Sequence, residues 1–319
     1  MSEFLLVKTS SMGDVINALP VVSDIRRHFP GAQIDWVVEE GFADIPMLHP
    51  GVRAILPVAI RRWRGRLAAA ATWAQIRAFK ASVQARQYEA VLDIQGLIKS
   101  AWITRLARGP RCGLDWKSAW EPPASLLYDR TFPVDPALHA IERYRRLAAA
   151  ALGYAADGPL EYGVRGPAEP LPWAPGEPYA VLLHATSRDE KRWDDAAWVE
   201  LARVLHGRGL VAVLPWGSPR ERSHAEFLAG RMPAARVAPA MRLREAASLI
   251  AKARIVIGVD TGLVHLAAAL GTPVIALFCG SDPAQNGVRA PTPAVNLGRP
   301  GQCPPVSDVL SAVEALAAA

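Results

Sequence analysis

The sequence predicts an α/β protein made of two similar halves. Short apolar runs without polar alternation recur along the chain and are separated by longer helical segments, a pattern typical of parallel sheets covered on both faces. Residues 155–178 hold ten Pro or Gly among 24 positions, which is typical of a linker. A length of 319 residues suits about two domains. The predicted organisation is therefore domain 1–154, linker 155–178 and domain 179–319.

The apolar runs define the expected strands, which are residues 4–7, 34–38, 90–94, 179–183, 210–214, 255–259 and 274–278. The stretches between them read as helices, which include residues 14–29, 196–208, 244–253 and 307–317. The half on which the last of these helices packs stays open.

Charge is distributed unevenly. Residues 1–153 hold 20 Lys or Arg against 14 Asp or Glu, whereas residues 154–319 hold 16 of each, so the whole net charge of +6 belongs to the first half. Residues 45–88 contain no acid at all. Their basic residues are Arg53, Arg61, Arg62, Arg64, Arg66, Arg77, Lys80 and Arg86. Such a block indicates an anionic partner: nucleic acid, a phosphorylated substrate or an anionic membrane surface.

Three cysteines, Cys112, Cys279 and Cys303, show no C-x-x-C spacing. We expect no disulfide framework and no structural zinc, and a reducing cytoplasm fits this cysteine content. The N-terminus carries an early acid and only a short apolar run, so it does not read as a signal peptide. No apolar run approaches the length of about 18 residues that spans a membrane, so any membrane contact is expected to be peripheral.

The loop at residues 8–14 directly follows the first strand, where open α/β sheets bind ligands. It supplies Lys8, Ser10, Gly13 and Asp14, and Gly13 would permit a tight turn. Asp14 has two interpretations that the sequence leaves open. It is either a helix cap or first-turn acid, or a general base in a cleft, where a helix dipole would keep its carboxylate ionised.

Two further loops follow predicted strands in the second half. Thr186, Ser187 and Lys191 offer hydroxyls and a cation for a phosphate, although the same stretch also fits an exposed charged loop. Asp260, Thr261 and Gly262 form a turn into a helix, whose free N–H groups suit an anion. His265 lies about one turn into that helix, and a half-buried structural histidine is the alternative.

Two other features also have alternatives. Glu221 is placed either to bind a ribose or to begin a helix in solvent. The segment 61–66, with Arg61, Arg62 and Arg64 around Trp63, fits a phosphorylated acceptor, nucleic acid or a solvated loop. There is no Asp-x-Asp pair and no His/Cys cluster with metal-ligand spacing. No G-x-G-x-x-G fingerprint is present either, which argues against a nicotinamide oxidoreductase.

Taken together, these residues resemble the lipopolysaccharide heptosyltransferases of glycosyltransferase family 9, a group of inverting enzymes that use ADP-heptose. The resemblance covers nearly the whole chain, and its carriers are residues 10–14, 115–130, 184–191 and 260–265. Type II members typically carry Asn-Asp-Ser-Gly where this chain has Val259 to Gly262, so the resemblance is to type I.

The resemblance implies a GT-B fold, in which two Rossmann-like domains face across a cleft. The N-terminal domain would bind the acceptor, Kdo-lipid A, through Lys8, Ser10, Gly13, Arg61, Arg62 and Arg64. Asp14 would be the catalytic base. The C-terminal domain would bind ADP-heptose through residues that include Met241 in the nucleoside pocket; the full set is Thr186, Ser187, Lys191, Glu221, Met241, Asp260, Thr261, Gly262 and His265. Lys191 would also stabilise the departing ADP.

The resemblance further implies a metal-independent reaction without a cofactor. The protein would be a monomer on the cytoplasmic face of the inner membrane, with a peripheral contact to its anionic surface and no nucleic-acid partner. Two alternatives stay open: a type II enzyme that acts on the already heptosylated core, and a basic nucleic-acid-binding protein.

Overall fold

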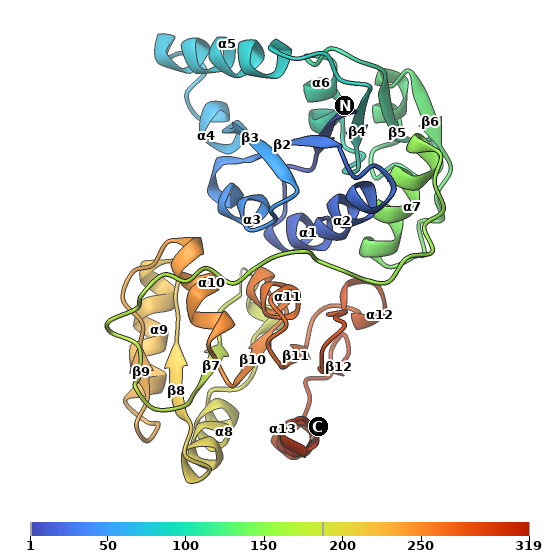
Figure 1. Cartoon of the computed structure of the whole chain (residues 1–319). Coiled ribbons are helices and arrows are strands. Elements are labelled where there is room, and N and C mark those ends of the chain that lie inside the picture. Colours follow the sequence, from blue (N-terminus) through green and yellow to red (C-terminus); the bar gives the residue numbers. More distant parts are fainter. Residues whose placement is uncertain (1, 187, 319) are drawn as a thin grey trace. The chain divides into compact units, whose positions relative to one another are not determined.

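The computed structural model describes residues 2–186 and 188–318. The chain forms two compact units, Met1–Val164 and Arg165–Ala319, which we call unit 1 and unit 2. The boundary between them falls inside the Pro- and Gly-rich segment 155–178. Figure 1 shows this segment as irregular chain between the last helix of unit 1 and the first strand of unit 2.

Unit 1 is built on a six-stranded parallel sheet with the order β3-β2-β1-β4-β5-β6 (Figure 1). Its strands are β1 Glu3–Val7, β2 Gln33–Glu39, β3 Val52–Val58, β4 Ala90–Asp93, β5 Arg111–Leu114 and β6 Arg130–Phe132. The three strands predicted in this half are confirmed to within one residue at each end. The strand β3 was not predicted, because Arg53 and Pro57 interrupt its apolar run.

The helices of unit 1 are α1 Met12–Asn17, α2 Leu19–His28, α3 Asp44–Met47, α4 Ile60–Arg64, α5 Ala70–Gln84, α6 Ile98–Thr104 and α7 Ala140–Leu152. The single helix predicted over residues 14–29 is wrong, since two helices meet at Ala18. Pro20 explains the break: it has no N–H to donate, and its ring would collide with the carbonyl four residues earlier in a continuous helix. At the start of α2 the same proline is well tolerated.

Unit 2 repeats the architecture, with the order β12-β11-β10-β7-β8-β9. Its strands are β7 Tyr179–Leu183, β8 Val211–Leu214, β9 Arg236–Val237, β10 Ile255–Val259, β11 Val274–Phe278 and β12 Ala294–Gly298. All strand pairs of both sheets are parallel. The predicted α/β class and the four strands predicted in this half are confirmed.

The helices of unit 2 are α8 Asp195–Gly207, α9 Pro219–Ala229, α10 Leu243–Ala251, α11 Gly262–Ala269, α12 Pro283–Asn286 and α13 Val306–Ala318. The C-terminal helix α13 packs within unit 2, which settles the point that the sequence left open. Its Val309 and Val313 are buried in the same core cluster as Leu201 and Leu205 of α8.

The strand order explains where ligands can bind. In each sheet the chain first builds outward on one side and then returns to build on the other. The order therefore reverses between β1 and β4 in unit 1 and between β7 and β10 in unit 2. Loops that leave the carboxyl ends of such neighbouring strands diverge and open a crevice. The predicted site loops follow β1, β7 and β10, three of these four strands.

The cysteines correct one expectation. Cys279, just after β11, forms a disulfide with Cys303, while Cys112 is free and buried. No sequence motif marks this pair, because its two cysteines are 24 residues apart without a recognised spacing. The tertiary structure brings them together: the turn at Gly301 has positive φ, and the Gly301 N–H donates to the Cys279 carbonyl at 2.7 Å.

Candidate active site

The loop after β1 places Asp14 in the first turn of α1. Ser11 is the N-cap, and both its N–H and its hydroxyl donate to Asp14 Oδ2, at 3.0 Å and 2.7 Å. Gly13 lies in the same helical turn, so the tight turn expected there is wrong. Asp14 thus makes the capping contacts of a first-turn acid, yet 37% of its side chain remains exposed.

The other carboxylate oxygen of Asp14 meets two residues from distant parts of unit 1. The hydroxyl of Tyr144, in α7, donates to Oδ1 at 2.6 Å. Lys8, at the end of β1, lies 3.6 Å from the same oxygen and donates to the Tyr144 hydroxyl at 2.8 Å. An ionised carboxylate has about four acceptor positions. Among the described residues Oδ1 accepts this one hydrogen bond, so it keeps a lone pair for a further donor.

The surroundings hold Asp14 in its charged form. Burial by itself would raise the pKa of its carboxyl, but the Lys8 ammonium and the hydrogen bonds from Tyr144 and Ser11 outweigh it and lower the pKa to about 2. Burial lowers the pKa of Lys8, against the attraction of Asp14 and Asp93. It raises the pKa of Tyr144 well above its usual range, and the Asp14 charge adds to this rise.

Two further polar residues meet this edge of the sheet. Gln95, just after β4, accepts from the N–H and the hydroxyl of Thr9 at 2.7 Å and 2.8 Å. Lys99, in α6, donates to Ser10 Oγ at 3.1 Å. Like Tyr144, these residues carry no sequence signal. They come from later strands and helices and become neighbours of the first loop only when the sheet has formed.

Some cations of the basic block, residues 45–88, are neutralised by acids from other parts of unit 1. Arg62, in α4, forms a two-pronged ion pair with Glu40, with both distances 2.9 Å, and Arg53 pairs with Asp35 and Glu3. The acids therefore come from outside residues 45–88. In the described part of the chain, the following cations of the block make no ion pair: Arg61, Arg64, Arg66, Arg77 and Lys80. Both Arg61 and Arg64 act electrostatically on Lys99.

In unit 2 the loops after β7 and β10 meet through an ion pair. Lys191 Nζ lies 2.5 Å from Asp260 Oδ2, and Ser281 donates to the same oxygen at 2.5 Å. The hydroxyl of Thr186 donates to the Asp260 carbonyl at 3.5 Å. The helix α11 begins at Gly262, with Thr261 as N-cap, and His265 is buried within it. Ser187 lies outside the described residues.

A hollow of about 220 Å³ adjoins this group. Its lining includes Thr186 and Glu221, and the full set is His184, Ala185, Thr186, Asp189, Arg192, Ser218, Arg220, Glu221 and His224. Glu221 begins α9 and accepts from the Gly217 N–H at 2.6 Å. Met241, just before α10, is partly exposed and does not line this hollow. Thr186 thus belongs both to the group around Asp260 and to the lining of the hollow that contains Glu221, while Met241, implied only by the resemblance, lies outside that lining.

A histidine pair forms one wall of the hollow. The Nδ1 atoms of His184 and His224 lie 2.9 Å apart, so one ring donates to the other, and His224 Nε2 lies 2.8 Å from Asp195. Burial lowers the pKa of His184 to about 4, and the neighbouring His224 and Arg192 add to this effect. His224 is not predicted as a site residue, since a single histidine in a helix carries no motif.

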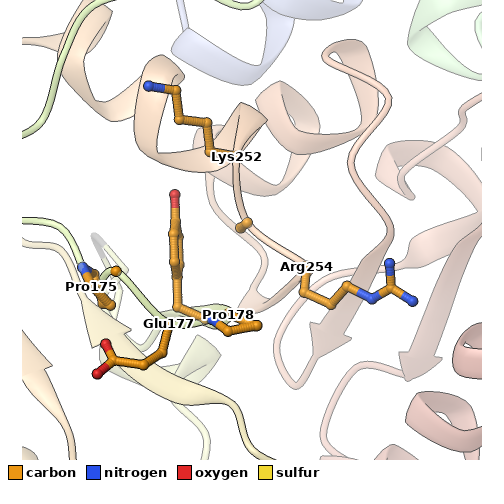
Figure 2. Close-up of a pocket in the computed structure, with 8 residues that line it drawn as sticks. Pro175, Glu177, Pro178, Lys252 and Arg254 are labelled. Carbon is orange, nitrogen blue, oxygen red and sulfur yellow. The ribbon is translucent and has the colours of Figure 1, made fainter.

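A second hollow, of about 460 Å³, lies at the amino ends of β7 and β10 (Figure 2). Its lining includes Glu177, Tyr179, Lys252 and Arg254. Figure 2 shows that the charged ends of Glu177, Lys252 and Arg254 point in different directions. Such a hollow offers no convergent set of groups to a ligand, in contrast to the groups around Asp260 at the opposite ends of the strands.

Across residues 2–186 and 188–318, no group of three or more His, Cys, Asp or Glu side chains is placed to hold a metal ion. Every helix in this part of the chain is too short or too polar to cross a bilayer.

Comparisons with known proteins show which family the chain is similar to. The family model described as "Glycosyltransferase family 9 (heptosyltransferase)" matches residues 76–305. Lipopolysaccharide heptosyltransferase 1 of Salmonella typhimurium is 48% identical over 283 residues, which cover 88% of this chain and 89% of the relative. The enzyme of the same name from Pseudomonas aeruginosa is 46% identical over 304 residues, which cover 94% of this chain and 85% of the relative.

A solved heptosyltransferase structure is also similar to this chain. The heptosyltransferase WaaC of E. coli with ADP superposes with a TM-score of 0.90 at 40% identity and covers 98% of this chain and 99% of its own. The two parallel six-stranded sheets, together with this superposition and the family match, identify a glycosyltransferase with the GT-B fold. The chain belongs to glycosyltransferase family 9, the heptosyltransferases. The similarity to the type I lipopolysaccharide enzymes, expected from its motifs, is confirmed.

Proposed function

We propose that the protein transfers L-glycero-D-manno-heptose from ADP-heptose to a Kdo hydroxyl of Kdo-lipid A, with inversion at the anomeric carbon and without a metal. The observation that carries the proposal is the Asp14 carboxylate, which is ionised, partly exposed and left with one open acceptor position. The relatives with structures bound to ADP and to ADP-2-deoxy-2-fluoro heptose support ADP-heptose as the donor.

Unit 1 would bind the acceptor. Its hydroxyl would donate a hydrogen bond to Asp14 Oδ1 and lose its proton there as its oxygen attacks the anomeric carbon. A carboxylate with a pKa of about 2 is a weak base. The proton would therefore move late, when the attacking oxygen already bonds to carbon and has become acidic. The Lys8 ammonium would then face a neutral acid.

Unit 2 would bind the donor at the group around Asp260. Negative charge grows on ADP as the bond to the sugar breaks, and a positive group placed there in advance lowers the barrier. Lys191 and the N–H groups at the start of α11 would serve this purpose. Asp260 holds the Lys191 ammonium before the donor arrives. Thr186 and Glu221 would add hydrogen bonds to the phosphates and the ribose.

The acceptor is a glycolipid, so the proposal includes a peripheral contact with the anionic cytoplasmic face of the inner membrane, made by a monomer. In α5, Arg77 and Lys80 follow Trp73 at helical spacing on an exposed side, and Leu67 is exposed just before the helix. Cations interleaved with large apolar side chains suit such a surface. Cosedimentation with anionic vesicles but not with neutral ones would support this contact, and equal sedimentation with both would contradict it.

The decisive experiment measures ADP release from ADP-heptose, with and without deacylated Kdo-lipid A, in EDTA. Release that depends on the acceptor supports metal-independent heptosyl transfer. Binding of ADP without any release would point to the already heptosylated core as acceptor. A release that EDTA abolishes and added Mg²⁺ restores would contradict the metal-free mechanism.

A further inference from the structure

Trp120 is a large aromatic side chain of unit 1 that stays 61% exposed. Its position is fixed by the backbone of the loop after β5. The neighbouring Glu121 N–H donates to the Gly96 carbonyl at 3.1 Å. A Cβ on Gly96 would stand 3.5 Å from the Trp120 nitrogen. Gly96 follows β4, the strand next to β1, so Trp120 lies at the same sheet edge as the loop that carries Asp14.

One face of the Trp120 indole is covered by a buried cation. The guanidinium carbon of Arg143, in α7, lies 4.5 Å from the ring centroid. Arg143 is only 4% exposed, and its Nη2 donates to the Ser118 carbonyl at 2.8 Å. Its Nε has no hydrogen-bond partner among the described residues. The indole is therefore held from one side, and its exposed area belongs to the opposite face and the ring edge.

Arg143 links the indole to the proposed base. It precedes Tyr144, whose hydroxyl donates to Asp14 Oδ1 at 2.6 Å. The charge of Arg143 also interacts with Asp14 and with Lys8. Trp120, Arg143, Tyr144 and Asp14 thus form a continuous series of neighbours along one edge of unit 1.

We propose that the open face of Trp120 is a platform on which the pyranose ring of the acceptor stacks, next to Asp14. This inference rests on the proposed function, which assigns a sugar acceptor to unit 1. A pyranose presents apolar C–H groups on its faces and directs its hydroxyls outward. Stacking on an indole removes apolar area from water and brings C–H groups onto the electron-rich ring, while the hydroxyls remain free to meet Asp14.

The cation behind the ring makes the platform rigid. Rotation of the indole would separate it from Arg143 and expose a buried guanidinium that has few other partners. A sugar plane fixed in this way leaves one ring hydroxyl to approach Oδ1. The stacking therefore contributes to acceptor affinity and orientation, and it has no part in donor binding.

The test uses the full chain with deacylated Kdo-lipid A, which cannot partition into a membrane. We expect Trp120→Ala to raise the acceptor KM about tenfold, which corresponds to about 1.4 kcal/mol. Trp120→Phe keeps an aromatic face and should restore most of the affinity. The Kd for ADP should not change in either variant. Trp102→Ala removes another tryptophan of similar exposure, 60%, and should leave the acceptor KM unchanged.

An unchanged acceptor KM in Trp120→Ala would overturn the inference while acceptor-dependent ADP release in the wild type still upheld the proposed function. A fall in kcat alone would also overturn it, since Trp120 would then act through Arg143 on Asp14. An effect that occurs only with acylated acceptor in vesicles would assign Trp120 to the lipid surface. If the wild type released no ADP, the proposed function would fail. Calorimetric titration of the acceptor into wild type and Trp120→Ala would then still decide whether the indole binds it.

Discussion

The carboxylate of Asp14 is held by three hydrogen bonds and faces one buried cation, an arrangement that keeps it ionised at neutral pH. The contacts from Ser11 are those of an ordinary helix start and fix Oδ2. Those from Tyr144 and Lys8 fix Oδ1, the oxygen with an open acceptor position. One side chain therefore stabilises the start of α1 and keeps part of its charged carboxylate group exposed.

Replacement of Asp14 tests its proposed role as the general base. We expect Asp14→Asn and Asp14→Ala to lower kcat by roughly a hundredfold to ten-thousandfold, the usual range for loss of a general base. The Kd for ADP should stay within about twofold, because the proposed donor residues lie in unit 2. Steady-state kinetics and an ADP titration measure both quantities. Asp308→Asn, at a first-turn acid of α13, is the control and should leave both unchanged. Equal losses of turnover and ADP affinity would remove Asp14 from the role of base.

Among the elements of unit 1, β3 and α4 carry arginines of the basic block that differ in whether an acid neutralises them. Two of the arginines, Arg53 and Arg62, are paired with acids from β1, β2 and the turn after β2. Arg61 and Arg64 of α4 make no ion pair within the described residues. Their charges reach Lys99, which is hydrogen-bonded to Ser10 beside the proposed base. An anion would therefore gain most from the unpaired arginines.

This difference between the arginines can be measured. We expect Arg64→Ala to raise the acceptor KM several-fold, and more than Arg62→Ala does, because Glu40 already neutralises Arg62. The effect should shrink as salt is raised, since exposed charges are screened. The ADP Kd should not change. Arg203→Ala, an exposed cation in α8 of unit 2, serves as the control. An acceptor KM that no arginine of α4 alters would separate the basic block from acceptor binding.

At the scale of the whole molecule, buried histidines make stability depend on pH. His49 is 5% exposed in unit 1 and accepts from the Gly51 N–H at Nδ1, at 2.9 Å. Burial, with the Arg26 charge, lowers its pKa to about 4. Its other ring nitrogen lies 3.0 Å from the Ser23 hydroxyl. Protonation of Nδ1 would end the bond to Gly51, so the folded state favours the neutral ring.

The lowered pKa of His49 decides in which direction the free energy of unfolding changes with pH. Below its ordinary pKa of about 6.5, an unfolded His49 takes up a proton that the folded protein resists. We therefore expect the free energy of unfolding to fall between pH 6.5 and pH 4, with a contribution from His49 of at most about 3 kcal/mol. Urea unfolding of His49→Asn, which keeps an acceptor for Gly51, should show a flatter curve in this range. His206→Asn, at an exposed position of α8, should not. Parallel curves for wild type and His49→Asn would contradict this assignment.

The α/β class, seven of the strands and the loops of the candidate site could be predicted from the sequence alone, because these predictions depend on local hydrophobic patterns and on the rule that ligands bind at the carboxyl ends of parallel strands. The sequence also carried the resemblance to the heptosyltransferases. Five strands went unpredicted: β3, β5, β6, β9 and β12. These are short or interrupted by polar residues, and tertiary pairing decides their state.

The neighbours of the predicted residues, by contrast, are known only from the folded chain. Tyr144 reaches Asp14 across 130 positions of sequence, and Ser281 reaches Asp260 across 21. The pairing of Cys279 with Cys303 likewise depends on a turn that the sequence did not mark. Contacts of this kind arise when separate strands and helices meet at one sheet edge. A local pattern can predict that a segment forms a strand or a helix, but it contains no information on which distant side chain will face that segment.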